Sequence, residues 1–403
     1  MKFDLSSSDI FLSLASLASA CPTRSVSTQR AFAHPGLLHT TKDFTRINGF
    51  LDAKREPWQT GFNKLATRAN ADHAPRATDV VCRGGAGREC NPENYAVLFR
   101  DTAAAYANAV HWRISGEEVH AEAAARILDA WSSTLKEIHG SSDKYLASGI
   151  YGYQLANAGE ILRGWSGWKG LPALIKVLND VFYPMNHRFL IEHNGAVIDH
   201  YWANWDLANL CTMQAIGILS DNVTMYNEAV DYFKNGAGNG AIRNAIWKLH
   251  DEPGSKKKLG QGQEAGRDQG HALLDFAFLG VFAHQSFNQG DDLFAYLDNR
   301  ILAGSEYAAK YNLRHDVPFA TFTNSHGTAE VISPDGRGEL RPIWELLYNH
   351  YGVLKGLNAS WTKQMRDHVN EEAGGAEGGG GDYGPNSGGY DQLGFGTLLY
   401  RLE

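Results

Sequence analysis

A succession of helical segments, with few strand signals between them, is the feature that most limits what this chain can fold into. Between Ala121 and Ile138, apolar residues recur every three or four positions with charged residues between them, which is typical of an amphipathic helix. Comparable spacing predicts further helices over 94–112, 207–218, 273–282 and 343–357. Because neither a βαβ rhythm nor a repeat period accompanies them, the pattern predicts an all-α fold in a single domain.

The first 20 residues are typical of a secretory signal peptide. Lys2 supplies a positive start, and the apolar run over 10–20 ends in the small residues Ala18, Ser19 and Ala20, which form a cleavage site. The acidic residues near this start are unusual in a signal, so an N-terminal helix of the mature fold is the alternative. We expect 1–20 to be removed and 21–403 to be secreted. No later run is long or apolar enough to span a bilayer.

Secretion changes how the cysteines are interpreted. The chain contains four of them: Cys21, Cys82, Cys90 and Cys211. Cys82 and Cys90 bracket a short Gly- and Arg-containing segment, and in an oxidising compartment a disulfide between them is expected. Cys211 lies in an apolar helical pattern and is expected to be a buried thiol. No Cys/His spacing resembles a zinc site.

Charge and composition exclude some classes of partner. The net charge is −8, whereas a nucleic-acid-binding protein normally shows a basic face. An anionic substrate remains compatible, because local basic groups in a cleft matter more than net charge. Asn222 and Asn358 begin glycosylation sequons, as in a secreted glycoprotein. The Gly-rich segment 374–389 is expected to be an exposed, mobile loop.

Three segments concentrate residues that could perform chemistry: 201–206, 266–271 and 341–351. They combine amide, imidazole, guanidinium and phenol groups, and the first and third also hold aromatic residues. That mixture suits an anionic sugar, because aromatic rings stack on sugar rings while polar groups bind carboxylate and hydroxyl groups. Arg267 and His271 are four residues apart and would share a helix face. Arg341 and Tyr348, with Trp344 and Glu345 between them, would share another.

Each candidate also has a purely structural interpretation. Asn204 could cap the helix that follows it, and His271 could be a hydrogen-bonded histidine inside the core. Arg267 and Asp268 could form a structural ion pair. Tyr348 could be a core aromatic residue with a bonded hydroxyl. Judged singly, the tryptophans of these segments are better explained as packing residues: Trp202, Trp205 and Trp344.

In their order along the chain, several segments resemble the alginate lyase superfamily of polysaccharide lyases. They are 34–40, 128–132, 152–158 and the three polar segments above. The resemblance implies an (α/α) toroid, an incomplete α/α barrel, whose cleft binds a polyuronate. It also implies a catalytic quartet, carried over to Asn204, His271, Arg341 and Tyr348. Some members place the histidine directly after the asparagine, where this chain has Trp205, and the pattern resembles the glucuronan- and mannuronan-cleaving branch.

The resemblance implies β-elimination, which removes the C5 proton beside a uronate carboxylate and expels the 4-O-linked sugar. Asn204 and His271 would bind that carboxylate and stabilise the enolate-like charge. Tyr348 would remove the proton and return one to the leaving oxygen, with Arg341 stabilising its phenolate. No metal or cofactor is needed. The remaining residues expected to bind substrate are Tyr201, Trp202, Trp205, Arg267, Gln269, Trp344, Glu345 and His350.

Two other functions compete with a lyase. An inverting glycoside hydrolase on the same toroid would need two carboxyl groups about 6.5–9.5 Å apart, and the candidates are Asp206, Asp268 and Glu345. A non-catalytic carbohydrate-binding protein is the second alternative. In every case we expect a monomer that binds an anionic polysaccharide, such as alginate or glucuronan, and neither nucleic acid nor a membrane.

Overall fold

The structure, a computed structural model, describes residues 30–85, 90–384 and 387–403. The expected signal peptide and Cys21 lie outside these residues. The chain divides into two units, Met1–Ala31 and Phe32–Glu403, and the description that follows concerns the second.

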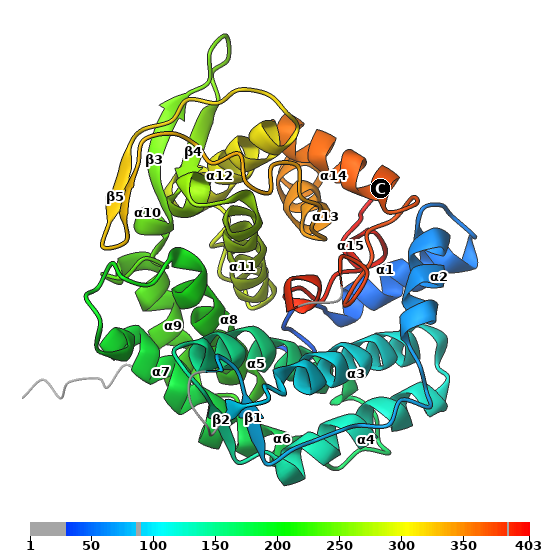
Figure 1. Cartoon of the computed structure of the whole chain (residues 1–403). Helices are drawn as coiled ribbons and strands as arrows, with labels where there is room; N and C mark the ends of the chain where they lie inside the picture. Colours follow the sequence, from blue (N-terminus) through cyan, green and yellow to red (C-terminus); the bar gives the residue numbers. More distant parts are fainter. Residues whose placement is uncertain (1–29, 86–89, 385–386) are drawn as a thin grey trace, which may run out of the picture. The chain divides into compact units, whose positions relative to one another are not determined.

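Within Phe32–Glu403, a layer of inner helices follows a ring (Figure 1). These helices are α3 (Tyr95–Ser115), α5 (Asp143–Leu162), α8 (Ala203–Leu219), α11 (Gln269–Asn288) and α13 (Trp344–Tyr348). Successive members are in contact from α3 to α11, and Gly280 of α11 lies against Leu346 of α13. Outer helices pack against them: α4 (Glu118–Thr134), α9 (Val223–Asn235), α12 (Tyr296–Asn312) and α14 (Ser360–Glu372). The predicted all-helical toroid is confirmed.

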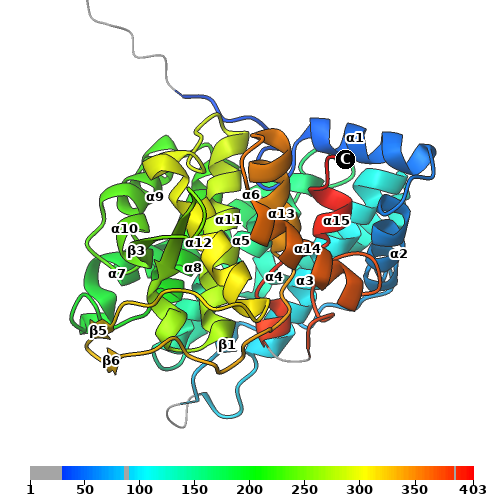
Figure 2. The ribbon, with the colours of Figure 1, turned by 90° about the horizontal axis from the view of Figure 1, so that it is seen from above.

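Shorter elements complete the unit. The other helices are α1 (Thr41–Asp52), α2 (Trp58–Arg68), α6 (Leu171–Val177), α7 (Tyr183–Glu192), α10 (Ile242–Ala245) and α15 (Gly396–Leu399). Three strand pairs are present in the described residues: β1 (Val80–Cys82) with β2 (Glu137–His139), β3 (Ile246–Asp251) with β4 (Lys258–Gly262), and β5 (Phe322–Asn324) with β6 (Gly327–Ala329). Figure 2 shows β1, β5 and β6 on the side opposite α1. In the part of the chain described, every helix is too short or too polar to traverse a bilayer.

Most of the predicted helices are present, with shifted ends. The segment 121–138 forms α4, but this helix ends at Thr134 because 137–139 pair with β1 as strand β2. The segment 343–357 forms α13 only as far as Tyr348 and then continues as a π-helix over Asn349–Leu354. The segment 94–112 corresponds to α3, which begins one residue later at Tyr95, and the segments 207–218 and 273–282 lie within α8 and α11.

Close packing of the inner layer depends on small residues. Nearly every residue of α8 is buried, which is typical of a helix that is apolar on all sides. A Cβ added to Gly149 of α5 would lie 2.7 Å from the backbone carbonyl carbon of Ala208. Glycine at that position therefore lets α5 and α8 approach closely.

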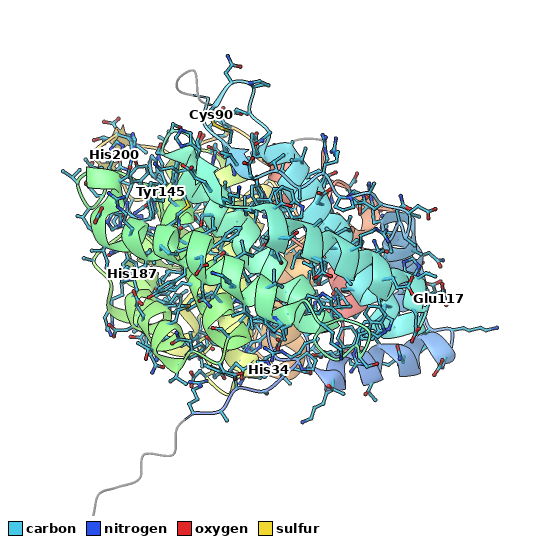
Figure 3. All side chains as sticks on the ribbon, turned by 90° about the horizontal axis from the view of Figure 1, so that it is seen from below. His34, Cys90, Glu117, Tyr145, His187 and His200 are labelled. Atoms are coloured by element: carbon cyan, nitrogen blue, oxygen red, sulfur yellow. A yellow bond between two sulfur atoms is a disulfide. The ribbon has the colours of Figure 1, made fainter. Side chains whose placement is uncertain are left out.

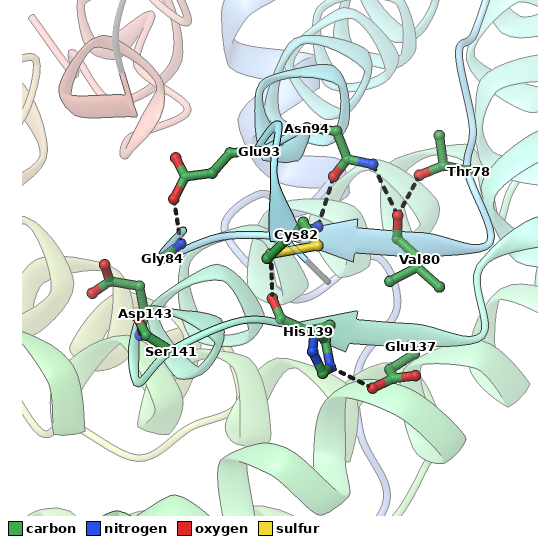
Figure 4. The surroundings of a disulfide bond; sticks show 11 residues. Thr78, Val80, Cys82, Gly84, Glu93, Asn94, Glu137, His139, Ser141 and Asp143 are labelled. Atoms are coloured by element: carbon green, nitrogen blue, oxygen red, sulfur yellow. Dashed lines mark hydrogen bonds and ion pairs between the residues drawn. A yellow bond between two sulfur atoms is a disulfide. The ribbon is translucent and has the colours of Figure 1, made fainter. Parts of the chain in front are cut away.

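The predicted disulfide between Cys82 and Cys90 is present, and Cys211 is a buried free thiol as expected. In Figure 3, Cys90 projects from the molecule on the side opposite His34. Figure 4 shows Asn94 beside the bridge, where Oδ1 accepts from the Cys82 backbone N–H at 2.6 Å. The bridge and this hydrogen bond fix the end of β1, and therefore the position of the residue that follows it.

The Gly-rich segment is only partly the exposed loop that its composition suggested. Gly374 and Gly375 are exposed, but residues 376–379 are buried, and Glu377 is fully buried. The Oε1 atom of Glu377 accepts from the backbone N–H groups of Trp344 and Glu345, each at 3.0 Å, at the start of α13. Glycine is needed because the backbone passes directly against other groups: a Cβ on Gly379 would collide with the Phe395 ring.

Glu377 should make stability fall as the pH rises. Burial, together with the neighbouring Glu345, raises the pKa of Glu377 to about 8. The folded chain therefore keeps a proton that the unfolded chain releases above its ordinary pKa of 4.5, so unfolding becomes easier between these pH values. We expect Glu377→Gln to remove a slope of up to about 1.4 kcal/mol per pH unit in the free energy of unfolding, measured in urea from pH 5 to 8. The exposed Glu372 provides the control Glu372→Gln, and an unchanged slope in Glu377→Gln would contradict this explanation.

Candidate active site

A cavity of about 350 Å³ lies where α5, α8, α11 and α13 begin. Its lining residues are Arg83, Leu146, Ile150, Asn204, Asp268, Gly270, His271, Leu274, Glu339, Arg341, Tyr383, Gly388 and Asp391. Asn204, His271 and Arg341, which come from the three polar segments of the sequence, therefore meet in one cavity. The start of each helix contributes a positive partial charge, but carboxylates of the protein already cap three of these helices.

Asn204 does not cap its helix. Helix α8 begins at Ala203, and the backbone N–H groups of Ala203 and Asn204 donate to Gln263 Oε1 and Glu264 Oε1, each at 3.0 Å. The side chain of Asn204 is thus released from a capping role. Its Oδ1 atom is buried and has no hydrogen-bond partner among the described residues, so the cavity holds an amide oxygen available to a ligand.

His271 is oriented by Asp268. Oδ1 of Asp268 caps α11 by accepting the His271 backbone N–H at 2.8 Å, and Oδ2 contacts Nδ1 of the ring at 2.7 Å. Nε2 lies 3.2 Å from Nη2 of Arg267. Because a guanidinium only donates, Nε2 accepts and the proton is on Nδ1. The ring is 40% exposed, so His271 is not a core histidine. A carboxylate on Nδ1 is the arrangement of a general base, although the Nε2 lone pair accepts from Arg267 in this structure.

Asp268 is ionised in this arrangement. Its burial opposes ionisation, yet hydrogen bonds from the His271 ring and backbone hold the pKa of Asp268 below its ordinary value. An anionic Asp268 would stabilise an imidazolium if His271 took up a proton.

Arg267 supports the site without lining the cavity. Its Nη1 donates to Glu264 Oε2 at 2.7 Å, and its Nε lies 3.6 Å from Asp268 Oδ2. Its guanidinium also lies 5.3 Å from the centre of the Trp202 ring, a cation–π distance. The structural ion-pair interpretation of Arg267 therefore holds, with Glu264 as the closer partner.

Arg341 supplies buried positive charge. Its side chain is 7% exposed and lies in the loop before α13. Nη1 donates to Gln392 Oε1 at 3.2 Å and lies 3.6 Å from Asp391 Oδ2, while Nε lies 3.5 Å from Glu339 Oε1. Burial raises the pKa of Asp391 although Arg341 opposes the shift. A protonated Asp391 would no longer neutralise part of the Arg341 charge, which could then attract an anionic ligand.

Four polar lining residues were not singled out from the sequence: Arg83, Glu339, Tyr383 and Asp391. Arg83 follows β1 and donates to the Tyr151 hydroxyl at 3.2 Å. The Tyr383 hydroxyl accepts from the Gly378 N–H at 3.2 Å. Burial and the nearby Glu377 raise the pKa of Tyr383, so its phenol stays protonated at neutral pH. Arg83 could have been noticed because it directly follows Cys82 of the disulfide pair. Tyr383 was overlooked because it lies in the Gly-rich segment, which was expected to be an exposed loop.

Tyr348 is not among the residues that line the cavity with Arg341. The expected helix began at Pro342 with Arg341 at its end, but α13 begins at Trp344, so the seven-residue spacing does not follow one helix face. Tyr348 is half-buried and does not line the cavity. Its ring instead lies 4.5 Å from the guanidinium of Arg366 on α14.

Four of the other predicted binding residues are buried parts of the fold. Gln269 donates to Ser333 O at 3.0 Å and is 1% exposed. Trp344 and Glu345 are fully buried. The carboxylate of Glu345 accepts hydrogen bonds from the side chains of Asn349, Asn370 and Thr397. His350 stacks on Phe294 at 3.8 Å between ring centres and borders a different cavity. These polar groups serve packing rather than a ligand.

The aromatic residues before α8 also pack mainly on one another. Tyr201 and Trp205 lie 4.8 Å apart between ring centres and join Phe189 in a small cluster. Trp202 is half-buried and stacks on His326 at 5.4 Å with an interplanar angle of 9°. Of these aromatic residues, Trp202 is the one linked to the site, through Arg267.

The carboxyl groups considered for hydrolysis do not converge. Asp206 is fully buried, and its Oδ2 accepts from the Tyr232 hydroxyl and the Gly240 N–H, each at 2.9 Å. Glu345 is buried as described above. Of the three carboxyl groups considered, only Asp268 lines the cavity.

No protein-family model and no curated protein sequence matches the chain, but several solved structures do. An alginate lyase from Bacteroides ovatus superposes with a TM-score of 0.58 at 11% identity, over 92% of this chain and all of the other. Alginate lyase A1-III from Sphingomonas species A1 gives 0.51 at 12% identity, over 90% and 95%. The chain shares the fold of these alginate lyases.

A third structure is a variant of the Sphingomonas enzyme in complex with a tetrasaccharide, with a TM-score of 0.50 and 14% identity over 90% of this chain and 94% of the other. At such identities the alginate lyase fold is what the similarity establishes.

Proposed function

We propose that this protein is a polysaccharide lyase that cleaves a β-1,4-linked polyuronate by β-elimination. The observation that carries the proposal is the meeting of Asn204, His271 and Arg341 in one cavity. The alginate lyase fold supports it, since the same fold occurs in enzymes named for this activity.

Charge neutralisation at the substrate carboxylate is the first task. Arg341 and Arg83 bring two guanidinium groups to the cavity, and guanidinium groups bind carboxylates through paired hydrogen bonds. The amide of Asn204 adds a further hydrogen-bonding group beside them. Binding the carboxylate makes the adjacent C5 proton more acidic and stabilises the charge that develops as the proton leaves.

Proton transfer is the second task. The substrate displaces the Arg267 N–H from His271 Nε2, which then takes the C5 proton, and Asp268 stabilises the imidazolium. A double bond forms between C4 and C5 as the C4–O4 bond breaks, and O4 receives a proton from the phenol of Tyr383. These roles replace the assignment of both steps to Tyr348, because Tyr348 does not line the cavity. No metal or cofactor enters the reaction.

The proposed substrate is alginate, including polymannuronate, or glucuronan. A tetrasaccharide bound to a protein of the same fold supports an oligosaccharide ligand. Secretion is part of the proposal, because these polymers are too large to reach an intracellular enzyme. It rests on the signal-like sequence over 1–20.

The test is a substrate screen with two simultaneous readouts. Purified full-length protein is incubated with polymannuronate, polyguluronate, glucuronan and hyaluronan, and both ultraviolet absorbance and new reducing ends are measured. We expect the two signals to rise together on mannuronate or glucuronate polymers, because elimination forms one unsaturated end for each broken bond. Carboxyl-reduced alginate is the matched control and should give neither signal.

Other outcomes identify the competing functions. Reducing ends without absorbance would mean hydrolysis and would refute the lyase. Binding of the polymer without either signal would mean a carbohydrate-binding protein.

A further inference from the structure

A second group of chemically active side chains lies at the turn between α3 and α4, away from the residues that line the cavity. It consists of His111 near the end of α3, Glu117 in the turn and His120 in the first turn of α4. One nitrogen of each histidine and one carboxylate oxygen all lie within 4.8 Å of one another. Figure 3 shows Glu117 at the edge of the molecule, far from Cys90.

The hydrogen bonds of Asn108 fix the tautomer of His120. Nδ2 of Asn108 donates to the backbone oxygens of Asn70 at 3.1 Å and Ala104 at 2.9 Å. Its Oδ1 must therefore accept, and the atom in contact is Nδ1 of His120 at 2.7 Å. With the proton on Nδ1, Nε2 carries a lone pair. That lone pair lies 3.8 Å from Glu117 Oε2, so two acceptors lie near each other and a cation between them would satisfy both.

His111 is also held in place by its surroundings. Its Nδ1 lies 3.2 Å from Ser115 Oγ, an atom that also accepts the Glu117 backbone N–H at 3.1 Å. One face of the ring stacks on Phe62, with ring centres 5.1 Å apart. The centre of the His120 ring lies 3.9 Å away. These contacts occupy Nδ1 and leave Nε2 of His111 to bind a ligand.

We propose that His111, Glu117 and His120 bind one zinc ion, with water as the fourth ligand. Two imidazoles and one carboxylate are a ligand set that zinc accepts. Metal-binding histidines normally donate their second ring N–H to a neighbouring oxygen, and Asn108 Oδ1 and Ser115 Oγ stand at those positions. Ligand atoms around a tetrahedral zinc lie about 3.3 Å apart, as bond lengths of 2.0–2.1 Å require. Glu117, with 61% of its side chain exposed, can close the remaining distance.

The zinc would join the end of inner helix α3 to the start of outer helix α4. None of its ligands lines the cavity. The sequence did not predict it, since one ligand is a carboxylate and the spacing His-x5-Glu-x2-His is not a familiar Cys/His pattern. The inference is independent of the proposed lyase activity.

The test uses untagged full-length protein freed of metal with a chelator. Zinc binding is measured by calorimetry, and cobalt(II) is then added to reveal its coordination by visible absorption. We expect one zinc per chain, a tetrahedral cobalt spectrum and a rise in melting temperature with added zinc. Glu117→Gln and His120→Asn should each weaken zinc binding by about tenfold or more. His120→Asn keeps a donor for Asn108 and removes the Nε2 ligand.

Glu118→Gln is the matched control, because it removes the same charge from the next exposed residue, which is not in the cluster. It should bind zinc as the wild type does. Two results would overturn the proposal. The first is that the wild type does not bind zinc stoichiometrically, which would mean that His120 and Glu117 share a proton instead. The second is that Glu117→Gln and Glu118→Gln bind zinc with equal affinity. Circular dichroism shows whether each variant is folded.

Discussion

Replacing His271 with alanine should lower kcat for polyuronate cleavage by about 10²–10⁴-fold, the usual contribution of a positioned general base. The contact with Asp268 places the ring proton on Nδ1, and in the proposed reaction Nε2 takes the C5 proton once the substrate has displaced Arg267 from it. KM should change little, because Arg341 and Arg83 still bind the carboxylate. The measurement is the initial rate of absorbance increase on the best polymer of the screen.

Asp268→Asn provides the companion variant. Asparagine is as good a helix cap as aspartate, so α11 should remain intact while His271 loses its anionic partner. In a serine protease the equivalent change costs about 10⁴ in kcat, and we expect a loss of at least about 10² here. Melting temperatures show whether the variants are folded. A folded His271→Ala enzyme that keeps more than a tenth of its activity would rule out this histidine as the base.

The second large effect concerns the choice between two tyrosines. Tyr383→Phe should lower kcat by about 10²–10⁴-fold because the leaving oxygen loses its proton donor. Tyr348→Phe should stay within about twofold of the wild type, since this ring packs on Arg366 outside the cavity. Rates are compared on the same polymer at the same pH.

Each tyrosine variant removes a single hydroxyl group. The Tyr383 hydroxyl accepts one backbone hydrogen bond, from Gly378, and its loss should cost about 1 kcal/mol in the free energy of unfolding. Rates are therefore measured well below the melting temperature. If Tyr348→Phe were inactive and Tyr383→Phe active, the assignment from family resemblance would be right and the one from the cavity wrong.

Local pattern was enough to predict several of the helices. The spacing of apolar residues depends on neighbours a few positions away, so α3, α8 and α11 could be read directly from the sequence. Asn204, His271 and Arg341 stood out because their segments concentrate amide, imidazole and guanidinium groups, and the family resemblance selected them from these segments. The Cys82–Cys90 pair was predictable because a short loop joins the two residues.

What could not be predicted depends on contacts between distant parts of the chain. The carboxylate of Glu345 could have bound a ligand, but inside the fold it accepts hydrogen bonds from the side chains of Asn370 and Thr397. Tyr348 does not line the cavity with Arg341 as expected, because α13 begins at Trp344 and leaves Arg341 in the preceding loop. The Gly-rich segment was misjudged because glycine is typical of mobile loops and also of backbone packed against other groups.

The span of the cavity along the chain also determines when it can form. Its wall includes Arg83 near one end of the described chain and Tyr383 and Asp391 near the other. A ribosome must therefore have made the chain as far as Gln392 before this wall of the pocket can exist. Until then Arg341 lacks Asp391 and Gln392, and α13 lacks the Glu377 cap until that residue docks. The cavity is consequently assembled late, when the segment that holds Tyr383 and Asp391 docks on the inner helices.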